Sequence, residues 1–378
     1  MARLDTITSI RPVPLDGVCV VIPAFNEEQL VSRCVASVLS AGLAPRQVFV
    51  IDDCSTDRTR DVLAMFDGIQ VIENPTRLGK LRGLQRALDL YQLPERFDFI
   101  ALLDADSHVD EMYFDTIART FAADPDATLV CGSPRSERRN WLTAYRAFDY
   151  DASSWMYKDA QDVLSVIAVA PGCASVYRSS VVRSLDWSGG TLVEDMDLTV
   201  QIHRRGLGRI RYAAQAISHT QDPQRLRDYI GQITRWYSGT WQVMRLRRLP
   251  RGWQRIDLEY GLLVGESLTF SILVMLLPLA LLMWPGAVLR ALLFDQLVAA
   301  VLVIVSAVRL RRCDVVLWFP TFAFLRAINC FIWVRTFWTE IVRGKSLDVW
   351  FTPQRYERPS SDHANRQGGS LCATPPIH

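Results

Sequence analysis

The stretch Phe97-Asp-Phe-Ile-Ala-Leu-Leu-Asp-Ala-Asp106 joins a short apolar run to two carboxylates one residue apart. Such a run is long enough for a buried strand and too short for a typical helix. Two earlier runs have the same form: Val18-Cys-Val-Val-Ile22, which ends at Pro23, and Gln47-Val-Phe-Val-Ile51, which continues into Asp52-Asp53. Because helical patterns follow these strands, the sequence predicts an α/β fold with a mostly parallel sheet and helices on both faces.

Acidic and polar residues stand at the carboxyl ends of the predicted strands, where open parallel sheets bind ligands. They are Asn26-Glu27, Asp52-Asp53 and Asp104-Ala-Asp106. Two carboxylates spaced as Asp104 and Asp106 can share a hard divalent cation with a diphosphate. A turn with acidic helix-capping residues would give the same short pattern, so the position directly after a strand is what favours a binding site.

Two further segments carry groups suited to diphosphate chemistry. Thr76-Arg-Leu-Gly-Lys80 opens a predicted helix, whose cations and free N–H groups suit a phosphate. A solvated basic helix start would look the same. Glu194-Asp195 precedes a helical run from Met196 to Arg204 and could supply a general base. Acids in a first helical turn also complement the helix dipole, so this pattern alone leaves both interpretations open.

The segment Gln232-Ile-Thr-Arg235-Trp236 is the most unusual of the polar segments. Its three key side chains lie within one helical turn. Arginine can hold a diphosphate bidentately, and an indole offers a platform for a sugar ring. An Arg-Trp pair just before apolar sequence could instead anchor a helix at a membrane interface.

The chain becomes strongly apolar after Tyr260. Gly261–Trp284, Ala287–Val308 and Val315–Ile341 each meet or approach the roughly 20 residues needed to cross a bilayer. Basic clusters flank all three, and three full spans would put one cluster on the wrong side under the positive-inside tendency. This conflict, together with Pro320 inside the third stretch, favours a re-entrant or interfacial position for that stretch.

Composition argues against several other classes of protein. The formal net charge of +2 gives no general attraction to nucleic acid. The eight cysteines form no CxxC pair, which argues against a disulfide framework and fits a reducing cytosol. The N-terminus shows no signal-peptide pattern. We therefore expect an extension (1–16), a cytosolic catalytic domain (17–244), a membrane region (245–345) and a cytosolic or disordered tail (346–378).

Taken in order, these segments resemble the membrane-embedded family 2 glycosyltransferases, the group of cellulose, chitin, hyaluronan and poly-N-acetylglucosamine synthases. The resemblance covers roughly Val18 to Arg358, and the QxxRW element at Gln232 is its most specific part. The ending Val349-Trp-Phe-Thr-Pro-Gln-Arg355 is similar to the tail of bacterial poly-N-acetylglucosamine synthases. The resemblance implies a GT-A fold facing the cytosol and an inverting displacement at the anomeric carbon.

For the donor, the resemblance implies that Asp53, with Asp52 beside it, holds the nucleotide base. Asp104 would contact the nucleotide, and Asp104 and Asp106 would bind Mg²⁺ or Mn²⁺ at the diphosphate. Lys80 would add positive charge around the leaving group. Further substrate contacts are expected from Pro23, Asn26 and Glu27.

For the acceptor, the resemblance implies that Asp195 deprotonates the attacking hydroxyl and that Glu194 orients it. Arg235 would stabilise the leaving group, and Gln232 and Trp236 would frame the acceptor end. The expected donor is UDP-N-acetylglucosamine, then UDP-glucose, with a GDP-sugar less favoured. The acceptor would be a growing saccharide or a lipid-linked sugar at the inner or plasma membrane.

One departure from the synthases concerns the membrane region. Those enzymes usually carry transmembrane helices before the catalytic domain, and no such run precedes Val18 here. A closed polymer channel within one subunit is therefore not expected, although a homo-oligomer could supply further walls.

Two other functions stay open. A single sugar could be loaded onto a polyprenyl phosphate, although such relatives generally lack QxxRW. A catalytically dead scaffold or a saccharide transporter is a second alternative, against which stands an acid at every position that the chemistry needs.

Overall fold

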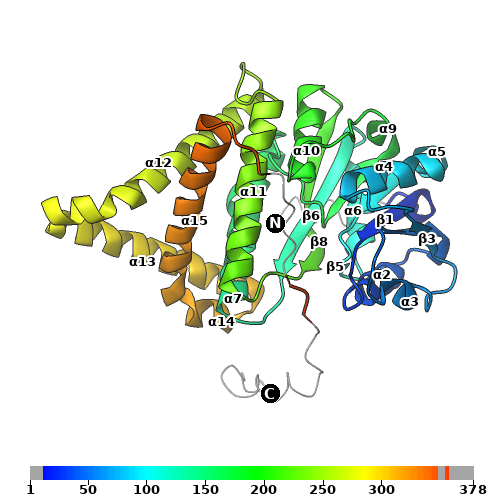
Figure 1. Cartoon of the computed structure of the whole chain (residues 1–378), viewed down its shortest axis with the longest axis horizontal. Helices are drawn as coiled ribbons and strands as arrows, with labels where there is room; N and C mark the ends of the chain where they lie inside the picture. Colours follow the sequence, from blue (N-terminus) through cyan, green and yellow to red (C-terminus); the bar gives the residue numbers. More distant parts are fainter. Residues whose placement is uncertain (1–11, 348–353, 357–378) are drawn as a thin grey trace, which may run out of the picture.

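The computed structural model describes residues 12–347 and 354–356. A sheet domain comes first along the chain, and long helices project from one side of it (Figure 1). Most of the predicted extension (1–16) and tail (346–378) therefore lies outside the described residues.

The sheet confirms the predicted α/β class. Its described strands lie in the order β3-β2-β1-β4-β7-β6-β8-β5. Four of the seven strand pairs are parallel, and β7 runs antiparallel to both β4 and β6. The strands are β1 Val18–Ala24, β2 Val48–Asp52, β3 Gln70–Glu73, β4 Phe99–Leu102, β5 Ser107–Val109, β6 Ala127–Ser136, β7 Ser175–Arg178 and β8 Arg209–Thr220.

The reversed strand β7 was not predicted, and it matters for the site. Ser175 pairs with Leu102, so β7 starts at the edge of the sheet where β4 ends. The turn before β7, which contains Gly172, is thereby placed beside the Asp104 turn. A strand that starts at this edge can only run back along the sheet, which is why the pairing is antiparallel.

Helices cover both faces of the sheet, as predicted. Val20 and Ile22 of β1 belong to one buried cluster, while Cys19 and Val21 belong to the other. This alternation buries β1 on both faces, as expected for a central strand of a parallel sheet. The helices up to the apolar region are α2 Val31–Ser40, α3 Thr59–Leu63, α4 Lys80–Leu90, α5 Leu93–Arg96, α6 Tyr113–Ala123, α7 Trp141–Ala152, α8 Asp159–Leu164, α9 Ser179–Val182, α10 Glu194–Arg204 and α11 Leu226–Leu246.

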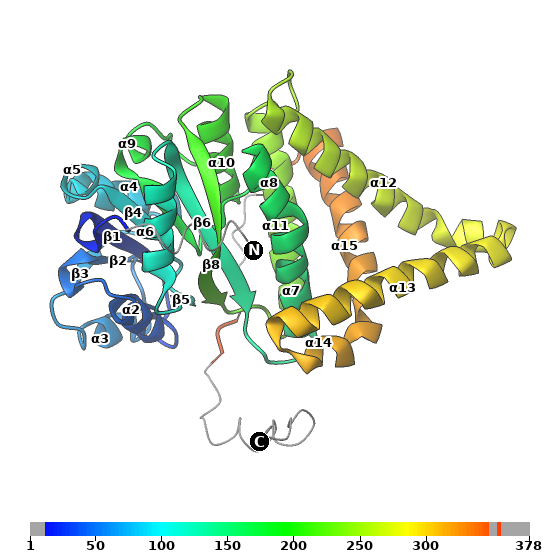
Figure 2. The same cartoon turned by 180° about the vertical axis from the view of Figure 1, so that it is seen from behind.

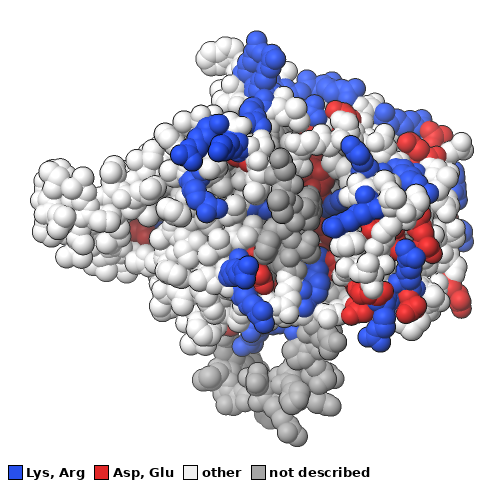
Figure 3. All heavy atoms as spheres, in the orientation of Figure 1, with Lys and Arg blue, Asp and Glu red and all other residues white. Residues whose placement is uncertain are grey.

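Two helices in the described chain are long and apolar enough to cross a membrane: α12 (Arg255–Met283) and α13 (Pro285–Leu310). They meet at an outer tip and diverge toward the sheet domain, and the hairpin they form is almost free of charged side chains on the face seen in Figure 3. Only 6% and 17% of their most apolar windows are buried. A core helix of a soluble protein would be mostly buried, and a signal sequence would lie near the N-terminus, so neither description fits.

The third apolar stretch is not one continuous helix. It divides into α14 (Cys313–Leu317), a 3₁₀ turn containing Pro320, and α15 (Phe322–Phe337), which ends in a π-helical turn. Proline lacks the N–H that a continuing helix needs, which explains the break. In both views α15 lies between α11 and the hairpin (Figure 2). A re-entrant or interfacial position for it stays a prediction.

Candidate active site

Lys80 contacts residues from both the donor side and the acceptor side of the predicted site. It is the first residue of α4, and its Nζ lies 2.6 Å from Asp104 Oδ1 and 2.5 Å from Glu194 Oε1. Burial lowers the Lys80 pKa, but the two carboxylates outweigh it and hold that pKa well above its usual value. One partly buried cation therefore joins the end of β4 to the start of α10.

Asp53 positions the loop that presents Lys80. Its Oδ1 accepts hydrogen bonds from the Leu78 N–H at 2.7 Å and from Asn74 Nδ2 at 2.8 Å, and its Oδ2 accepts one from the Gly79 N–H at 2.8 Å. Gly79 has a φ of +81°, a conformation in which a side chain would be strained. The predicted contact between Asp53 and a nucleotide base stays a prediction, while its bonds to this loop are part of the fold.

Asp52 and Asn26 stabilise the turns that follow β2 and β1. Asp52 is fully buried, pairs with Arg60, and accepts a hydrogen bond from the Ser55 N–H at 3.0 Å. Asn26 has a φ of +55° and its Oδ1 accepts the Thr56 N–H at 2.8 Å. In this conformation the Asp52 carboxylate presents no surface to a ligand, and its bonds hold the turn that follows β2.

Glu27 and Asp106 share a partner that sequence reasoning missed. Arg355 Nη1 donates to Asp106 Oδ2 at 2.8 Å, and Arg355 Nε donates to Glu27 Oε1 at 3.0 Å. Burial raises the pKa of Glu27 to about 7, even though the charge of Arg355 acts in the opposite direction. The similarity of residues 349–355 to a synthase tail was the available signal, but it assigned Arg355 no role.

Asp195 lies at the N-terminus of α10, with its carboxylate held by two backbone groups. Its Oδ1 accepts the Met196 N–H at 2.8 Å, and its Oδ2 accepts the Gly172 N–H at 3.1 Å. Burial and the adjacent Glu194 charge raise the Asp195 pKa to about 6, against the lowering effect of Lys80. A carboxylate with a pKa near the operating pH is suited to general base catalysis.

Helix α11 carries Gln232, Arg235 and Trp236, as predicted. Arg235 Nη1 donates to the Leu192 carbonyl at 3.2 Å, beside the start of α10. Burial acts to raise the Asp104 pKa, but Lys80, Arg235 and Arg355 hold it below its usual value. Arg235 therefore lies close enough to influence Asp104, a position that a membrane anchor would not need.

The other two side chains of this motif are enclosed rather than exposed. Gln232 is 9% exposed, and no described residue provides a hydrogen-bond partner for its Oε1. The Trp236 ring lies 4.8 Å below the Arg146 guanidinium of α7. A buried amide oxygen without a partner is costly unless a ligand or water satisfies it, which is consistent with the predicted acceptor contact.

Known proteins are similar to this chain in sequence. A family model described as glycosyltransferase like family 2 matches residues 14–239, more than half of the chain. The chain belongs to this family. Curated relatives include the probable glycosyltransferase YdaM of Bacillus subtilis (strain 168), 29% identical over 241 residues, and the poly-beta-1,6-N-acetyl-D-glucosamine synthase of Staphylococcus aureus (strain COL), 23% identical over 236 residues. Each match covers 61% of this chain and 56% of the relative's length.

The fold of this family 2 glycosyltransferase is also seen in a solved enzyme. The mannosyltransferase PcManGT from Pyrobaculum calidifontis, determined with GDP-Man and Mn²⁺, has a TM-score of 0.59 at 17% identity. The match covers 89% of this chain and 93% of that one. At this identity the likeness shows the fold alone, which confirms the predicted GT-A architecture.

The glycosyltransferase offers a divalent cation two carboxylates and no complete cage. Asp104 and Asp106 are 33% and 17% exposed, and each is held by a side-chain cation, Lys80 or Arg355. Across residues 12–347 and 354–356, no group of three or more His, Cys, Asp or Glu side chains is placed to hold a metal ion by itself. This fits Mg²⁺ or Mn²⁺, since such ions are often held by one or two carboxylates together with substrate phosphates.

The predicted site residues thus fall into three groups. Lys80, Asp104, Glu194 and Asp195 are brought together directly, and Arg235 lies near them. Glu27 and Asp106 are joined by Arg355. The remaining ones support the surrounding turns or line the acceptor side: Pro23, which pairs with Ile51 inside the sheet, and Asn26, Asp52, Asp53, Gln232 and Trp236.

Proposed function

We propose that this glycosyltransferase is metal-dependent and inverting, and that it moves a hexose or N-acetylhexosamine from a UDP-sugar to a growing saccharide. The observation that carries the proposal is the bridge from Asp104 through Lys80 to Glu194, with Asp195 next in the chain. Lys80 thereby connects a turn suited to bind a diphosphate with the helix start that carries a carboxylate suited to act as a base. The poly-N-acetylglucosamine synthase relatives and the QxxRW helix support a saccharide acceptor.

In this proposal, Asp106 and Asp104 hold Mg²⁺ or Mn²⁺, which would offset negative charge on the departing diphosphate. Lys80 and Arg235 add fixed positive charge on the same side. Because Arg355 contacts Asp106 in the described structure, it has to share or yield that oxygen when a cation binds.

The transfer step uses Asp195 as general base. The carboxylate takes the proton of the acceptor hydroxyl, and the hydroxyl oxygen forms the new bond to the anomeric carbon. The bond from that carbon to the diphosphate oxygen breaks, and the nucleoside diphosphate leaves with the electron pair. Attack opposite the leaving group inverts the configuration. The backbone bonds from Gly172 and Met196 aim the Asp195 carboxylate.

Membrane attachment is proposed to come from the hairpin of α12 and α13. Their exposed apolar surface needs a hydrocarbon solvent. Arg255 begins α12 and Arg309 lies in the last turn of α13, so both ends next to the sheet domain are basic. By the positive-inside tendency, the catalytic domain would then lie on the cytosolic face of the cell membrane.

The test is a donor screen with the full chain in detergent micelles. UDP-N-acetylglucosamine, UDP-glucose and GDP-mannose are each supplied with Mg²⁺ or Mn²⁺, and nucleoside diphosphate release and product size are measured. We expect UDP-N-acetylglucosamine to support metal-dependent release and a saccharide longer than its primer. A single-sugar lipid extractable into organic solvent would replace the proposed acceptor with a polyprenyl phosphate. Equal release with and without metal would refute the metal requirement.

A further inference from the structure

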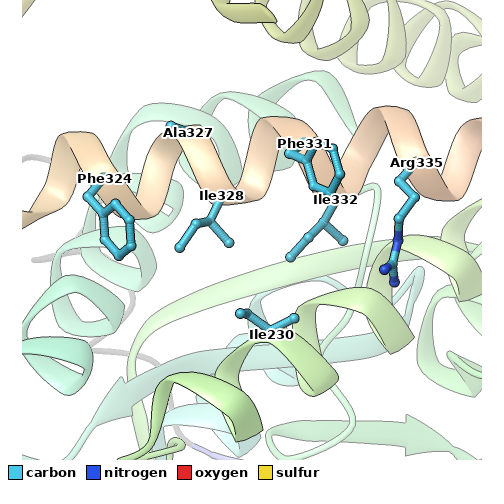
Figure 4. Close-up of a pocket in the computed structure, with 7 residues that line it drawn as sticks. All are labelled: Ile230, Phe324, Ala327, Ile328, Phe331, Ile332 and Arg335. Atoms are coloured by element: carbon cyan, nitrogen blue, oxygen red, sulfur yellow. The ribbon is translucent and has the colours of Figure 1, made fainter.

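A groove of about 370 Å³ lies between α11 and α15, away from the sugar-transfer site (Figure 4). This volume is within the range of about 300–1,000 Å³ that is common for small-molecule sites. Ile230 lines the groove from α11, and it lies roughly 140° around that helix from Arg235 at 3.6 residues per turn. Helix α11 therefore separates the groove from Asp195 and the acceptor side.

The groove is apolar except at one end. Phe324, Ile328 and Ile332 point from α15 toward Ile230, and Arg335 closes the end nearest the C-terminus of α15. From Phe324 to Arg335 the helix rises about 16 Å, comparable to half of a bilayer core that is about 30 Å thick. The shape suits one extended apolar chain with an anionic group at its end.

Arg335 is the one cation that lines this groove, and its guanidinium is available to such a group. No carboxylate or other acceptor among the described residues contacts it, and the side chain is exposed. Arginine matches phosphate oxygens bidentately, whereas an apolar peptide would leave this charge without a partner. The charge therefore favours a phosphate over an uncharged occupant.

The groove also lies where a lipid would meet it. Phe324 and Phe331 of α15, and Trp338 in the turn that follows it, leave more than half of their surface exposed. Arg326 of α15 is tied to Asp295 of α13 by contacts of 2.9 and 3.0 Å, which holds α15 against the hairpin. If the hairpin spans the bilayer, α15 therefore lies against lipid as well.

We propose that the groove binds one acyl chain of an anionic glycerophospholipid, with the lipid phosphate on Arg335. The proposal rests on the membrane attachment proposed above but not on the sugar chemistry. A lipid in this place would hold α11 against α15, and so steady the helix that carries Gln232 and Arg235.

Native mass spectrometry of the full chain with added lipid tests the proposal. We expect phosphatidylglycerol to bind more tightly than phosphatidylcholine of the same chain length. Arg335→Gln should weaken phosphatidylglycerol binding about tenfold, the scale of one charge-assisted contact. Ala327→Trp, which fills the groove from an exposed position, should weaken both lipids. Arg290→Gln, an exposed arginine near the hairpin tip, should change neither.

Several results would overturn the proposal. They are unchanged lipid preference in Arg335→Gln, equal competition by glycerophosphoglycerol without acyl chains, tighter binding of undecaprenyl phosphate, or an Ala327→Trp variant that alters dimerisation instead of lipid binding. Membrane fractionation and donor hydrolysis are measured on the same preparations. If the wild type fails in those two assays, the proposed function is wrong. If only the lipid-binding measurements fail, the proposed lipid site in the groove is wrong.

Discussion

The sheet domain and the α12–α13 hairpin are built for different solvents. In the sheet domain, apolar side chains fill two buried clusters, one on each face of the sheet. In the hairpin, apolar side chains cover the outside, and its windows are at most 17% buried. The first region folds by removing apolar surface from water, while under the proposed membrane attachment the second places its apolar surface in the lipid bilayer.

The charged residues of the two regions also differ in the partners that they contact. Lys80 in the sheet domain touches two carboxylates of the proposed active site, Asp104 and Glu194. Arg326 in the helical region touches one carboxylate, Asp295, and lies 5.2 Å over the Phe270 ring. Changing a charge at the proposed active site should therefore cost activity, whereas changing Arg326 should cost stability.

The largest expected effect comes from Asp195→Asn, which removes the proposed base. Transfer should fall by about 10²–10⁴-fold, the usual contribution of a general base. Stability should change little, because two effects oppose each other: one backbone N–H loses its acceptor oxygen, and the buried charge is removed. Because the folded pKa of Asp195 is raised to about 6, its charged form opposes folding as pH rises through that value, and asparagine removes this penalty at pH 7. Nucleoside diphosphate release and thermal unfolding measure the two effects.

Asp197→Asn, two residues along α10, is the matched control. Asp197 is buried and pairs with Arg247 at 2.6 and 2.7 Å, away from the proposed chemistry. The Asp197→Asn variant should lose about 1–3 kcal/mol of its free energy of unfolding, while the molecules that remain folded keep their turnover. If Asp195→Asn kept near-normal turnover, the assignment of the base would be wrong.

The second-largest effect is expected on stability, at the Asp295–Arg326 pair. Arg326→Leu leaves a carboxylate unpaired in apolar surroundings, which should cost about 2–3 kcal/mol if the hairpin is in hydrocarbon. Adding Asp295→Leu should restore most of the loss. Thermal unfolding in lipid nanodiscs measures both, and turnover per folded molecule should stay unchanged.

Arg119→Leu serves as the comparison in the sheet domain. Its pair with Asp115 has a similar exposure, 27% and 29%, against 29% and 38% for the hairpin pair. An exposed pair in water contributes less than about 1 kcal/mol. Equal losses in the two variants would mean that both pairs are in the same solvent, and the comparison of the two regions would fail.

A smaller effect is expected at Arg355. Its charge lies against Asp106 and opposes a divalent cation there. Arg355→Gln should therefore lower the Mn²⁺ concentration for half-maximal nucleotide binding about tenfold, or 1.4 kcal/mol. Arg355→Lys keeps the charge and should behave more like the wild type. A higher Mn²⁺ requirement in the glutamine variant would show that Arg355 supports the loaded site.

Arg355 also shows which part of the site could not be predicted from the sequence. Strand ends are set by local patterns, so the sequence alone places Asp53 and Asp104 at one edge of the sheet. The reversal of β7, which brings Gly172 to Asp195, depends on pairing between distant strands, and no local pattern encodes it. The contact of Arg355 with Asp106 spans 249 residues and was missed for the same reason.

The smallest expected effect is in the pH dependence of the wild type. The proposed base acts as a carboxylate, so kcat/KM should be flat above pH 7 and should fall as pH drops through the Asp195 pKa of about 6. At that pH about half of the free enzyme carries the base in its active form, a twofold loss. An unperturbed aspartate with a pKa of about 3.9 would keep full activity there.

Burial and Glu194 are the causes of this raised pKa, so Glu194→Gln supplies the sharper measurement. Removing that negative charge should move the acid limb of the pH profile to lower pH, apart from any change in the plateau rate. A structural role for Glu194 would lower the plateau without moving the limb. An unmoved limb would therefore mean that Glu194 acts structurally, through its contact with Lys80, and that the carboxylate pair does not set the pH range of transfer.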